Sequence, residues 1–595
     1  MHRRAIDTRM IVLKDQDSGR WLHFSRPYQV VVTHRTEEVP ACLEEIDRLV
    51  RTRGWAAAGF LAYEAAPALD PALKVARDKD TFPLLWFGLY PPPRPMDLGE
   101  SAMPLPELSW TATVNQDQYI KAFARIQALI AAGDTYQVNY TYRLHAPYTD
   151  VGTTWPLFTR LAGDHAPAYG GYLEIPDWTI LSLSPELFFR LRGDWIESIP
   201  MKGTISRAPI PADDRQQGRR LHDSSKDRAE NVMIVDMVRN DLSRIAVPGS
   251  VRVKELFALE RHPTLWQMVS PVLARTKASF KEICTALFPA ASITGAPKAR
   301  TMAIINELET GPRRIYTGTI GFFLPDRRAQ FNVAIRTLLL DHNKEMLEYG
   351  VGGGITADST AEGEWEETRL KSLVCRTRPP QFSLLETLLW TPEQGYLFLA
   401  EHLARMQVSA EYFNRPFDPD LLQARLTAAV RGFAMMPQRV RVLLDRNGRL
   451  EIETTSCPPH DCDQPVRIVP APFPVDDTDV FLYHKTTRRE VYERIRADLP
   501  QEADDVLLYN HRGEITETTI ANIVVTIDGR DWTPPVRCGL LAGTHRQHLL
   551  DCGRLEERVL TLDDLRGPGG FALVNAVRGR YPAVLLPGEL SLLGK

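Results

Sequence analysis

The chain has 595 residues, of which 44% are hydrophobic and 25% are charged. This composition is typical of soluble globular proteins, and the length is too great for a single hydrophobic core. The 71 Lys and Arg against 75 Asp and Glu give a net charge of −4, so no basic excess indicates a nucleic-acid partner or an anionic membrane surface. With no apolar signal segment, no membrane-length apolar run and scattered cysteines, we expect a cytoplasmic location and reduced thiols.

The predicted elements of the first half alternate between strands and helices. Apolar runs at 29–33 and 58–63 predict strands, and a helical pattern covers 41–50. Prolines between residues 91 and 106 predict a loop. A second helix is expected over 115–133, where apolar residues recur at helical spacing.

The chain is predicted to divide near residue 376. A charged stretch ends there in a proline pair, and a fresh strand pattern follows at 382–390. We expect a first domain over 1–375, a linker over 376–382 and a second domain over 383–595. Within the first domain, an N-terminal part would cover 1–95 and a core 115–375. The expected fold class is mixed, α+β and α/β.

A lysine lies in the turn-forming run Ser-Ile-Pro-Met-Lys-Gly-Thr-Ile at 198–205. Pro200 fixes one backbone angle and Gly203 frees another, so the backbone around Lys202 should have a defined shape. A desolvated lysine loses its proton readily and becomes a nucleophile. A solvated lysine in a hairpin turn is the plainer alternative, and these eight residues alone favour it.

Two acidic pairs have the spacing of one helix face: Asp227 with Glu230, and Glu364 with Glu367. Ser359 and Glu362 have capping-box spacing, which predicts a helix start just before the second pair. Two such pairs would form an oxygen-ligand cradle for Mg²⁺. Taken singly, either pair is more commonly a solvated helix face.

Eight motifs of the first domain resemble the chorismate-utilising enzymes, in the order in which that family has them. They are Gly-Asp-Thr-Tyr-Gln-Val-Asn at 133–139, Ser-Pro-Glu-Leu-Phe at 184–188, Pro-Met-Lys-Gly-Thr at 200–204, Lys-Asp-Arg-Ala-Glu-Asn at 226–231, Ser-Ile-Thr-Gly-Ala-Pro-Lys at 292–298, Ala-Ile-Arg-Thr at 334–337, Gly-Val-Gly-Gly-Gly at 350–354 and Glu-Trp-Glu-Glu-Thr at 364–368. The resemblance covers 10–375 and implies a chorismate-binding β-sandwich with surrounding helices. Lys202 stands where anthranilate synthases have a small residue, so the resemblance favours the aminodeoxychorismate synthase component I branch.

The resemblance implies roles for the residues of these motifs. Lys202 would attack the chorismate ring, and Glu186 would protonate the departing hydroxyl. Glu230 and Glu367 would hold Mg²⁺, supported by Asp227 and Glu364. The implied substrate contacts are Arg336 and Tyr316 on the enolpyruvyl carboxylate, Ser292 on the ring carboxylate, the backbone N–H groups of Gly352 and Gly354, and Thr204.

Two absences refine the expectation for this domain. Gln267 stands where many relatives have a histidine linked to pyruvate elimination, which indicates that the reaction in this pocket ends before elimination. The alternative is that glutamine replaces this histidine without changing the reaction. None of the seven cysteines lies in a Gly-x-Cys-x-Gly turn of the kind that carries a glutaminase nucleophile. Ammonia would therefore come from a separate glutamine amidotransferase chain or from free ammonium.

Five motifs of the second domain resemble the pyridoxal-phosphate enzymes of the branched-chain and D-amino-acid aminotransferase type. They are His-Leu-Ala-Arg-Met at 402–406, Lys-Thr-Thr at 485–487, Glu-Thr-Thr-Ile-Ala-Asn at 517–522, Gly-Leu-Leu-Ala-Gly-Thr-His-Arg at 539–546 and Asn-Ala-Val-Arg-Gly at 575–579. Read without the resemblance, 480–489 is a strand-like run ending in a basic loop, and 505–522 is strand, turn and strand.

This second resemblance implies a two-subdomain fold-type-IV unit that binds pyridoxal phosphate. Lys485 would bind the cofactor covalently and later move the proton, and Glu517 would pair with the pyridine nitrogen. The cofactor phosphate would meet Arg405, the backbone near Gly543 and Thr544, and the turn at Asn575. Relatives of this type are dimers, so a homodimer through this domain is expected.

The motifs do not separate a lyase from an aminotransferase, but the covalent link to the first domain favours 4-amino-4-deoxychorismate lyase. The chain is then expected to make 4-aminobenzoate, a folate precursor, from chorismate. One alternative joins an anthranilate synthase component I to an aminotransferase. Another makes the second domain a non-catalytic dimerisation module.

Overall fold

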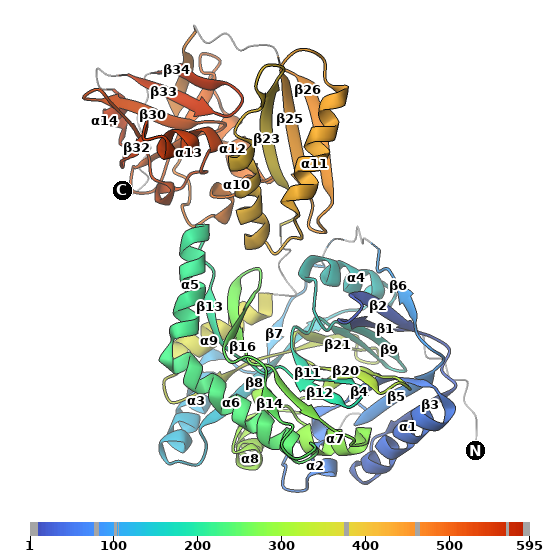
Figure 1. Cartoon of the computed structure of the whole chain (residues 1–595). Helices are drawn as coiled ribbons and strands as arrows, with labels where there is room; N and C mark the ends of the chain where they lie inside the picture. Colours follow the sequence, from blue (N-terminus) through green and yellow to red (C-terminus); the bar gives the residue numbers. More distant parts are fainter. Residues whose placement is uncertain are drawn as a thin grey trace. The chain divides into compact units, whose positions relative to one another are not determined.

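The computed structural model describes residues 10–76, 82–99, 104, 106–373, 380–457, 464–566 and 570–586. It divides into two compact units (Figure 1). The first comprises residues 1–204, 222–260 and 267–379, and the second comprises 205–221, 261–266 and 380–595. Residues 376–379 of the predicted linker 376–382 lie outside the described residues.

Two large antiparallel sheets form the first unit. One has the strand order β18-β8-β22-β21-β10-β9-β1-β2-β6, with β7 also on β8, and the other β14-β17-β12-β11-β20-β19-β4-β5-β3. The strands of the first are β1 (Met10–Asp15), β2 (Arg20–Phe24), β6 (Arg94–Met96), β7 (Thr111–Ala112), β8 (Gln137–Pro147), β9 (Gly171–Ile175), β10 (Trp178–Ser182), β18 (Gly295–Ala296), β21 (Thr337–Asp341) and β22 (Met346–Ile355). Those of the second are β3 (Gln29–Thr33), β4 (Ala56–Leu61), β5 (Leu85–Tyr90), β11 (Leu187–Arg192), β12 (Trp195–Ser198), β14 (Arg252–Val253), β17 (Val272–Arg275), β19 (Thr319–Phe323) and β20 (Arg328–Val333). A small sheet has the order β13-β16-β15, from β13 (Met201–Ser206), β15 (Ala258–Arg261) and β16 (Leu265–Val269), of which residues 201–204, 258–260 and 267–269 belong to this unit.

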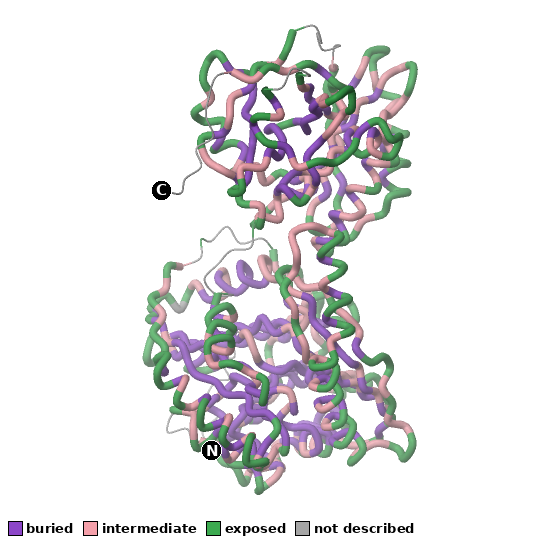
Figure 2. Tube along the Cα trace, turned by 90° about the vertical axis from the view of Figure 1, so that its left-hand side faces the viewer, coloured by how far each residue is buried: buried purple, intermediate pink, exposed green. Residues whose placement is uncertain are grey.

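The two large sheets pack face to face as a sandwich. Ile11 and Leu173 of the first sheet share one buried cluster with Phe60 and Phe322 of the second. Helices cover the outer face of each sheet. The outward side chains of each sheet and the side chains of its helices share a buried hydrophobic cluster. The buried residues accordingly lie inside the unit (Figure 2). The expected sandwich with surrounding helices is confirmed.

The helices of the first unit begin and end at residues suited to those positions. They are α1 (Val39–Arg53), α2 (Ala66–Leu69), α3 (Gln116–Ala131), α4 (Thr154–His165), α6 (Ser225–Ser243), α7 (Phe280–Leu287), α8 (Lys298–Leu308) and α9 (Ala361–Ser372). The side chain of Asn115 accepts from the Gln118 N–H, and the Gln118 side chain accepts from the Asn115 N–H, a capping box that starts α3. Gly54 ends α1 in the left-handed region at φ 67°.

Two local predictions for the first unit are wrong. The proline-rich stretch contains a strand, β6, which pairs with β2 through Leu22 and Pro95; an edge strand tolerates proline because one side of its backbone has no partner strand. Helix α9 starts just before Glu364, as predicted, but its N-cap is Thr360, whose side chain accepts from the Gly363 N–H. Ser359 does not cap this helix, because its hydroxyl donates to Glu364 at 2.7 Å.

The second unit contains two sheets. The four-stranded sheet has the order β24-β23-β25-β26, from β23 (Leu384–Thr391), β24 (Gly395–Tyr396), β25 (Gln438–Leu444) and β26 (Leu450–Ser456). Helices α10 (Leu399–Tyr412) and α11 (Pro419–Ala429) pack on it through Met406 and Leu422. Residues 205–221, with most of α5 (Pro211–Asp223), also belong to this unit.

The eight-stranded sheet has the order β29-β28-β27-β34-β33-β30-β31-β32, and an additional β29–β30 pairing joins its first strand back to the sheet. Its strands are β27 (Val466–Pro470), β28 (Asp505–Tyr509), β29 (Ile515–Thr518), β30 (Asn522–Ile527), β31 (Arg530–Thr533), β32 (Glu556–Glu557), β33 (Phe571–Asn575) and β34 (Gly579–Leu585). The associated helices are α12 (Glu490–Arg496), α13 (Thr544–Asp551) and α14 (Leu562–Leu565). The predicted two-subdomain unit is confirmed.

The run before Lys485 is not the expected strand. Residues Val480–Leu482 form a 3-10 turn, which begins because the Asp479 side chain accepts from the Phe481 N–H. Lys485 follows this turn, and its carbonyl accepts from Leu385 N at 2.9 Å. Among the described residues, no helix is both long and apolar enough to cross a membrane.

Candidate active sites

Lys202 lies in the small sheet of the first unit, in β13, and faces helix α6. Its Nζ is 3.1 Å from Glu230 Oε2, and about a fifth of each side chain is exposed (20% and 19%). An ammonium has no lone pair for attack, so Lys202 must lose a proton, for example to the paired Glu230 carboxylate, before it acts as a nucleophile. Lys202 is therefore placed as an ion-paired lysine at the edge of a site, not as a lysine in an apolar pocket.

The glycine run at 350–354 makes room for these side chains. A Cβ added to Gly353 would lie 2.6 Å from Glu364 Oε2, and one added to Gly354 would lie 3.2 Å from Lys202 Nζ. A Cβ at Gly350 would lie 2.2 Å from the ring of Tyr316. β22 is therefore close to the lysine, to one acidic pair and to the predicted substrate contact Tyr316.

The second acidic pair lies around another ammonium group, which the sequence analysis did not single out. Lys371 Nζ is 2.6 Å from Glu367 Oε1 and donates to the carbonyl of Gly352 at 3.0 Å. Burial opposes ionisation of Glu367, but Lys371 and Lys202 lower its pKa overall. Burial raises the pKa of Glu364, whose Oε2 is buried without a hydrogen-bond partner.

The four predicted ligands have the right chemistry for Mg²⁺, but their side chains are not close enough together to form a metal site. All four predicted ligands are carboxylates, the oxygen donors that Mg²⁺ prefers, and Glu364 Oε2 is an unpaired buried oxygen. In the part of the chain that the structure describes, no three His, Cys, Asp or Glu side chains come together closely enough to hold a metal ion. Instead, Lys202 and Lys371 occupy the positions beside Glu230 and Glu367.

Glu186 and Ser292 form a hydrogen-bonded pair in the first unit. Ser292 Oγ donates to Glu186 Oε1 at 2.6 Å, and only 6% of Glu186 is exposed. Burial raises the pKa of Glu186 to about 7, against the opposing effects of Ser292 and Lys371. A small cavity of about 20 Å³ lies beside the pair, enough for about one water molecule.

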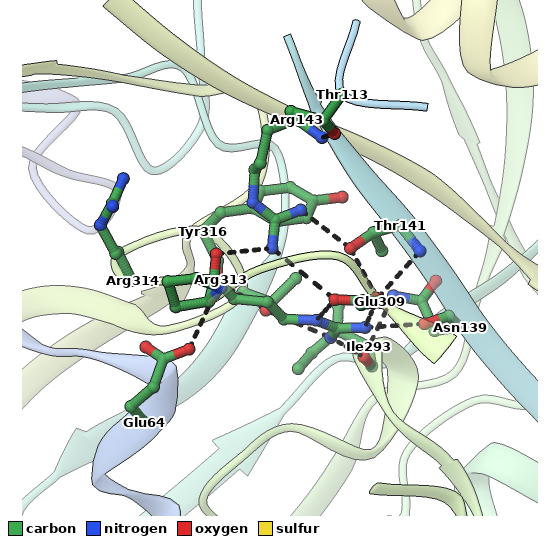
Figure 3. A network of polar contacts seen from close by, with 12 residues as sticks. Glu64, Thr113, Asn139, Thr141, Arg143, Ile293, Glu309, Arg313, Arg314 and Tyr316 are labelled. Carbon is green, nitrogen blue, oxygen red and sulfur yellow. Dashed lines mark hydrogen bonds and ion pairs between the residues drawn. The ribbon is translucent and has the colours of Figure 1, made fainter. Parts of the chain in front are cut away.

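A buried ion network holds the loop that carries Ser292 (Figure 3). Arg313 donates to the carbonyl of Ile293 at 2.9 Å and forms an ion pair of 2.6 Å with Glu309. Glu309 also accepts from both the N–H and the hydroxyl of Thr141, and Asn139 donates to the same Ile293 carbonyl. The network therefore fixes the residue after Ser292 against strand β8.

Three predicted substrate contacts, Thr204, Arg336 and Gly352, have surroundings that do not by themselves indicate a substrate-binding role. Thr204 is exposed, and Arg336, with φ 50°, is half-buried. Among the described residues, no hydrogen bond or ion pair joins either side chain to Lys202 or Glu186. Gly352, expected to offer its N–H, is engaged through its carbonyl by Lys371.

In the second unit, Lys485 and Glu517 form a second lysine-centred site. Burial and the nearby Arg405 lower the pKa of Lys485 to about 8. Burial raises the pKa of Glu517 to about 7. Tyr492 donates to Glu517 Oε1 at 3.0 Å and Asn522 to Oε2 at 3.2 Å, so both carboxyl oxygens of Glu517 are held in fixed directions.

Arg405 lies at the other end of this site and is held by Glu386. It donates twice to that carboxylate, at 2.8 and 2.6 Å, and once to the carbonyl of Ala542 at 3.0 Å. Arg405 and His402 lower the pKa of the buried Glu386 to about 2 despite its burial. An ionised Glu386 only accepts, so His402 Nδ1 carries the proton at 2.6 Å and Nε2 is free to accept from Thr544, 3.3 Å away.

The start of α13 completes this end of the site. Gly543 is the N-cap, and a Cβ there would lie 2.0 Å from Asn522 Oδ1, so only glycine fits. His545 is 3.1 Å from the carbonyl of Asn575, which places Asn575 beside the first turn of the helix. Free N–H groups at a helix N-terminus bind anions, and Arg405 adds a cation.

Sequence reasoning missed Lys371, Glu386, His402, Tyr492 and Asn522. Lys371 follows Glu367 by one helical turn, which is a readable signal. His402 and Asn522 lie inside the recognised motifs without a role assigned to them. Nothing local to Glu386 or Tyr492 marks them, because a sheet and a helix bring them to the site.

The first unit is a two-sheet sandwich with an ion-paired lysine at its candidate site, and the second unit has two sheets and a lysine of lowered pKa at its own candidate site. Residues 95–375 match the family of chorismate binding enzymes, and residues 383–586 match amino-transferase class IV. The chain therefore carries a chorismate binding enzyme domain followed by an amino-transferase class IV domain.

Several known proteins are similar to the first of these domains. Aminodeoxychorismate synthase component 1 of Salmonella typhimurium is 42% identical over 262 residues, 44% of this chain and 57% of that protein. Anthranilate synthase component 1 1 of Haloarcula marismortui is 40% identical over 266 residues, 43% of this chain and 53% of that protein. The chain thus spans a little over half the length of these relatives. The crystal structure of anthranilate synthase component I from Streptococcus pneumoniae TIGR4 is 21% identical with a TM-score of 0.52, covering 63% of this chain and 94% of that one, which shows the fold.

An amino-transferase class IV domain implies pyridoxal phosphate, and the residues of the second unit fit that group. They provide a lysine of lowered pKa, a doubly hydrogen-bonded carboxyl and an arginine next to a helix N-terminus. These suit, respectively, the aldehyde, the ring nitrogen and the phosphate of the cofactor.

Proposed function

We propose that the chain makes 4-aminobenzoate in two steps. In the first, chorismate and ammonia give 4-amino-4-deoxychorismate and water. In the second, 4-amino-4-deoxychorismate loses pyruvate and becomes the aromatic 4-aminobenzoate. The observation that carries the proposal is the position of the Lys202 amine, 3.1 Å from Glu230 and close enough to Glu364 and Glu367 to act on their pKa values.

In the first step, Lys202 gives a proton to the paired Glu230 carboxylate, the neutral amine forms a bond to a ring carbon, and the ring hydroxyl leaves. Glu186 is suited to donate the proton with which that hydroxyl departs as water, because its pKa near 7 leaves it substantially protonated at neutral pH. Ammonia then adds to the ring, and the bond to Lys202 breaks, which returns the lysine. Dividing one difficult substitution into two easier ones is what covalent catalysis offers.

Glu230 and Glu367 would hold Mg²⁺, with Asp227 and Glu364 in support. The ion would supply positive charge for the ring carboxylate of chorismate. Arg336, with Tyr316, would bind the enolpyruvyl carboxylate as a planar guanidinium fork. Ser292, Thr204 and the backbone of Gly352 and Gly354 would complete the substrate contacts.

The role of Glu186 predicts a specific pH dependence. Only the protonated acid donates, so the first step should slow as pH rises through about 7, the pKa of Glu186. Glu186→Gln should lose about 10²- to 10⁴-fold in rate, the usual size of general acid catalysis, and should lose this limb of the profile. The measurement is chorismate consumption from pH 6 to 9 with free ammonia held constant; an unchanged limb in Glu186→Gln would contradict the assignment.

In the second step, pyridoxal phosphate supplies an electron sink for the carbon next to the substrate nitrogen. Lys485, with its pKa near 8, can release and take up a proton near neutral pH. Tyr492 and Asn522 each donate a hydrogen bond to one oxygen of the Glu517 carboxyl and so hold it in place. Glu386 orients Arg405 for the phosphate, beside the N–H groups of α13.

The proposal includes partners and location. A separate glutamine amidotransferase subunit would supply ammonia, because neutral solutions contain mostly ammonium. The second unit would form a homodimer, and the protein would work in the cytoplasm, without a nucleic-acid or membrane partner.

The test gives the purified chain chorismate, ammonium and Mg²⁺, with and without pyridoxal phosphate. With the cofactor we expect 4-aminobenzoate and pyruvate in equal amounts, and without it 4-amino-4-deoxychorismate. Anthranilate as the product would instead identify the anthranilate synthase alternative. 4-Amino-4-deoxychorismate that never aromatises, in protein shown by its absorbance to hold the cofactor, would identify the second unit as a non-lyase.

A further inference from the structure

The backbone of the proposed nucleophile is irregular at the residue that follows it. Gly203 has φ 98°, in the left-handed region. A Cβ at Gly203 would lie 3.2 Å from Asp227 Cβ and 3.4 Å from Met268 Cβ. β13 is also an edge strand of the small sheet. A strand with an irregular residue and one open edge needs other contacts to hold its shape.

The first such contact comes from Asn231. Its Nδ2 donates to the carbonyl of Lys202 at 3.1 Å, and its Oδ1 accepts from Ser270 Oγ at 2.6 Å. Ser270 Oγ in turn accepts from Phe257 N at 2.9 Å. Asn231 is 1% exposed and Ser270 0%. The carboxamide is therefore fixed at both ends, and its donor side is left for Lys202.

The second contact comes from Gln267 on β16. Its Nε2 donates to the carbonyl of Gly203 at 2.9 Å, and only 8% of the residue is exposed. Two successive carbonyls, those of Lys202 and Gly203, thus accept from two buried carboxamides on different elements. Carboxamides keep both donor and acceptor at any physiological pH, so these contacts do not change with protonation.

Helix α6 ties the same lysine at a second point. Glu230 and Asn231 are neighbours on α6, where Glu230 meets the Lys202 ammonium and Asn231 meets its carbonyl. One turn of helix therefore fixes both ends of the lysine. Fixing the backbone limits the volume that Nζ explores on its four-carbon side chain, and a displacement of about 1 Å can cost about a hundredfold in rate.

We propose that Asn231 and Gln267 are positioning residues that hold the backbone of Lys202, a pair that we name the carboxamide clamp. The role in catalysis rests on the proposed function of Lys202, whereas the clamp itself does not. Neither side chain needs to touch chorismate, so loss of the clamp should lower kcat and leave KM for chorismate unchanged.

The test uses Asn231→Asp and Gln267→Glu in the full chain, because each keeps the shape but replaces the donor with an acceptor. We expect kcat for chorismate consumption with ammonium to fall by about ten- to hundredfold, with KM unchanged. Hydrogen exchange followed by mass spectrometry should be faster at 201–206 in both variants. Gln267→His, which restores an N–H donor, should recover part of kcat.

The matched control is Gln330→Glu on β20. Gln330 is also buried, at 5% exposure, and donates to the carbonyl of Lys14 at 2.6 Å. The Gln330→Glu variant should have its melting temperature lowered about as much as Gln267→Glu. Its kcat and its hydrogen exchange at 201–206 should stay as in the parent chain.

The outcomes separate the clamp from the proposed function. Exchange at 201–206 that stays unchanged in both variants overturns the clamp. Faster exchange with unchanged kcat, or a raised KM with unchanged kcat, overturns its positioning role. A parent chain that consumes no chorismate overturns the proposed function and with it the catalytic role, while hydrogen exchange still decides the clamp.

Discussion

Lys202→Ala is expected to abolish formation of 4-amino-4-deoxychorismate, with a loss of roughly a thousandfold or more, as for removal of a nucleophile. The Lys202 amine is 3.1 Å from the Glu230 carboxylate and would lie 3.2 Å from a Cβ added to Gly354 of the glycine run. Without it, ammonia must displace the ring hydroxyl directly. The measurement is chorismate consumption in the presence of saturating ammonium, with the product followed by chromatography.

Lys202→Arg is the matched control for charge. It keeps a cation beside Glu230 but offers no amine of comparable nucleophilicity, since a guanidinium stays protonated. Both variants should fail in the first step and should still convert added 4-amino-4-deoxychorismate to 4-aminobenzoate. If Lys202→Arg retains near-parental activity, the lysine acts through its charge and the covalent route is wrong.

Lys485→Ala is expected to have the opposite phenotype. The first step should proceed at the parental rate, and 4-amino-4-deoxychorismate should accumulate, with 4-aminobenzoate reduced by roughly a thousandfold or more. The visible absorbance of covalently bound pyridoxal phosphate should also disappear. The reason is that burial and the nearby Arg405 lower the pKa of Lys485, against the opposing effect of Glu517.

A Lys485→Ala variant that still releases pyruvate at the parental rate would place the elimination elsewhere. The first unit would then be the candidate, and Gln267 would be a neutral replacement for the family histidine. Mixing Lys202→Ala with Lys485→Ala protein supplies a control: each chain carries one intact site, so the mixture should form 4-aminobenzoate through released intermediate.

Regular elements could be predicted well where one local rule decides. The run at 29–33 coincides with β3 (Gln29–Thr33), and the helical pattern from 115 corresponds to α3 behind its Asn115 cap. Prediction was wrong where two local rules compete. Ser359 and Thr360 both have a hydroxyl near the start of α9. Only the folded structure shows that the Ser359 hydroxyl donates to Glu364, which leaves Thr360 as the N-cap.

The candidate sites were predictable in their motif residues but not in their contacts. Lys202, Glu186 and Lys485 stand out because they lie in motifs of characteristic spacing. The partners that shape them come from elements distant in sequence: Gln267 reaches Gly203 from 64 positions away, and Asn231 reaches Lys202 from 29 positions away. Spacing along the chain carries no information about such contacts, since they depend on how the sheet and helix pack.

Burial of Glu186 also has a consequence for the stability of the fold. A carboxyl whose pKa is raised from 4.5 to about 7 binds its proton more tightly when folded than when unfolded. The free energy of unfolding therefore falls as pH rises from about 4.5 to about 7, by about 3 kcal/mol in total, and stays reduced above that range. The first unit is thus least stable, in this respect, at the alkaline side of neutrality, where free ammonia is most abundant. Through this one side chain, proton donation and folding both favour the acid side of neutrality, whereas the supply of free ammonia favours the alkaline side.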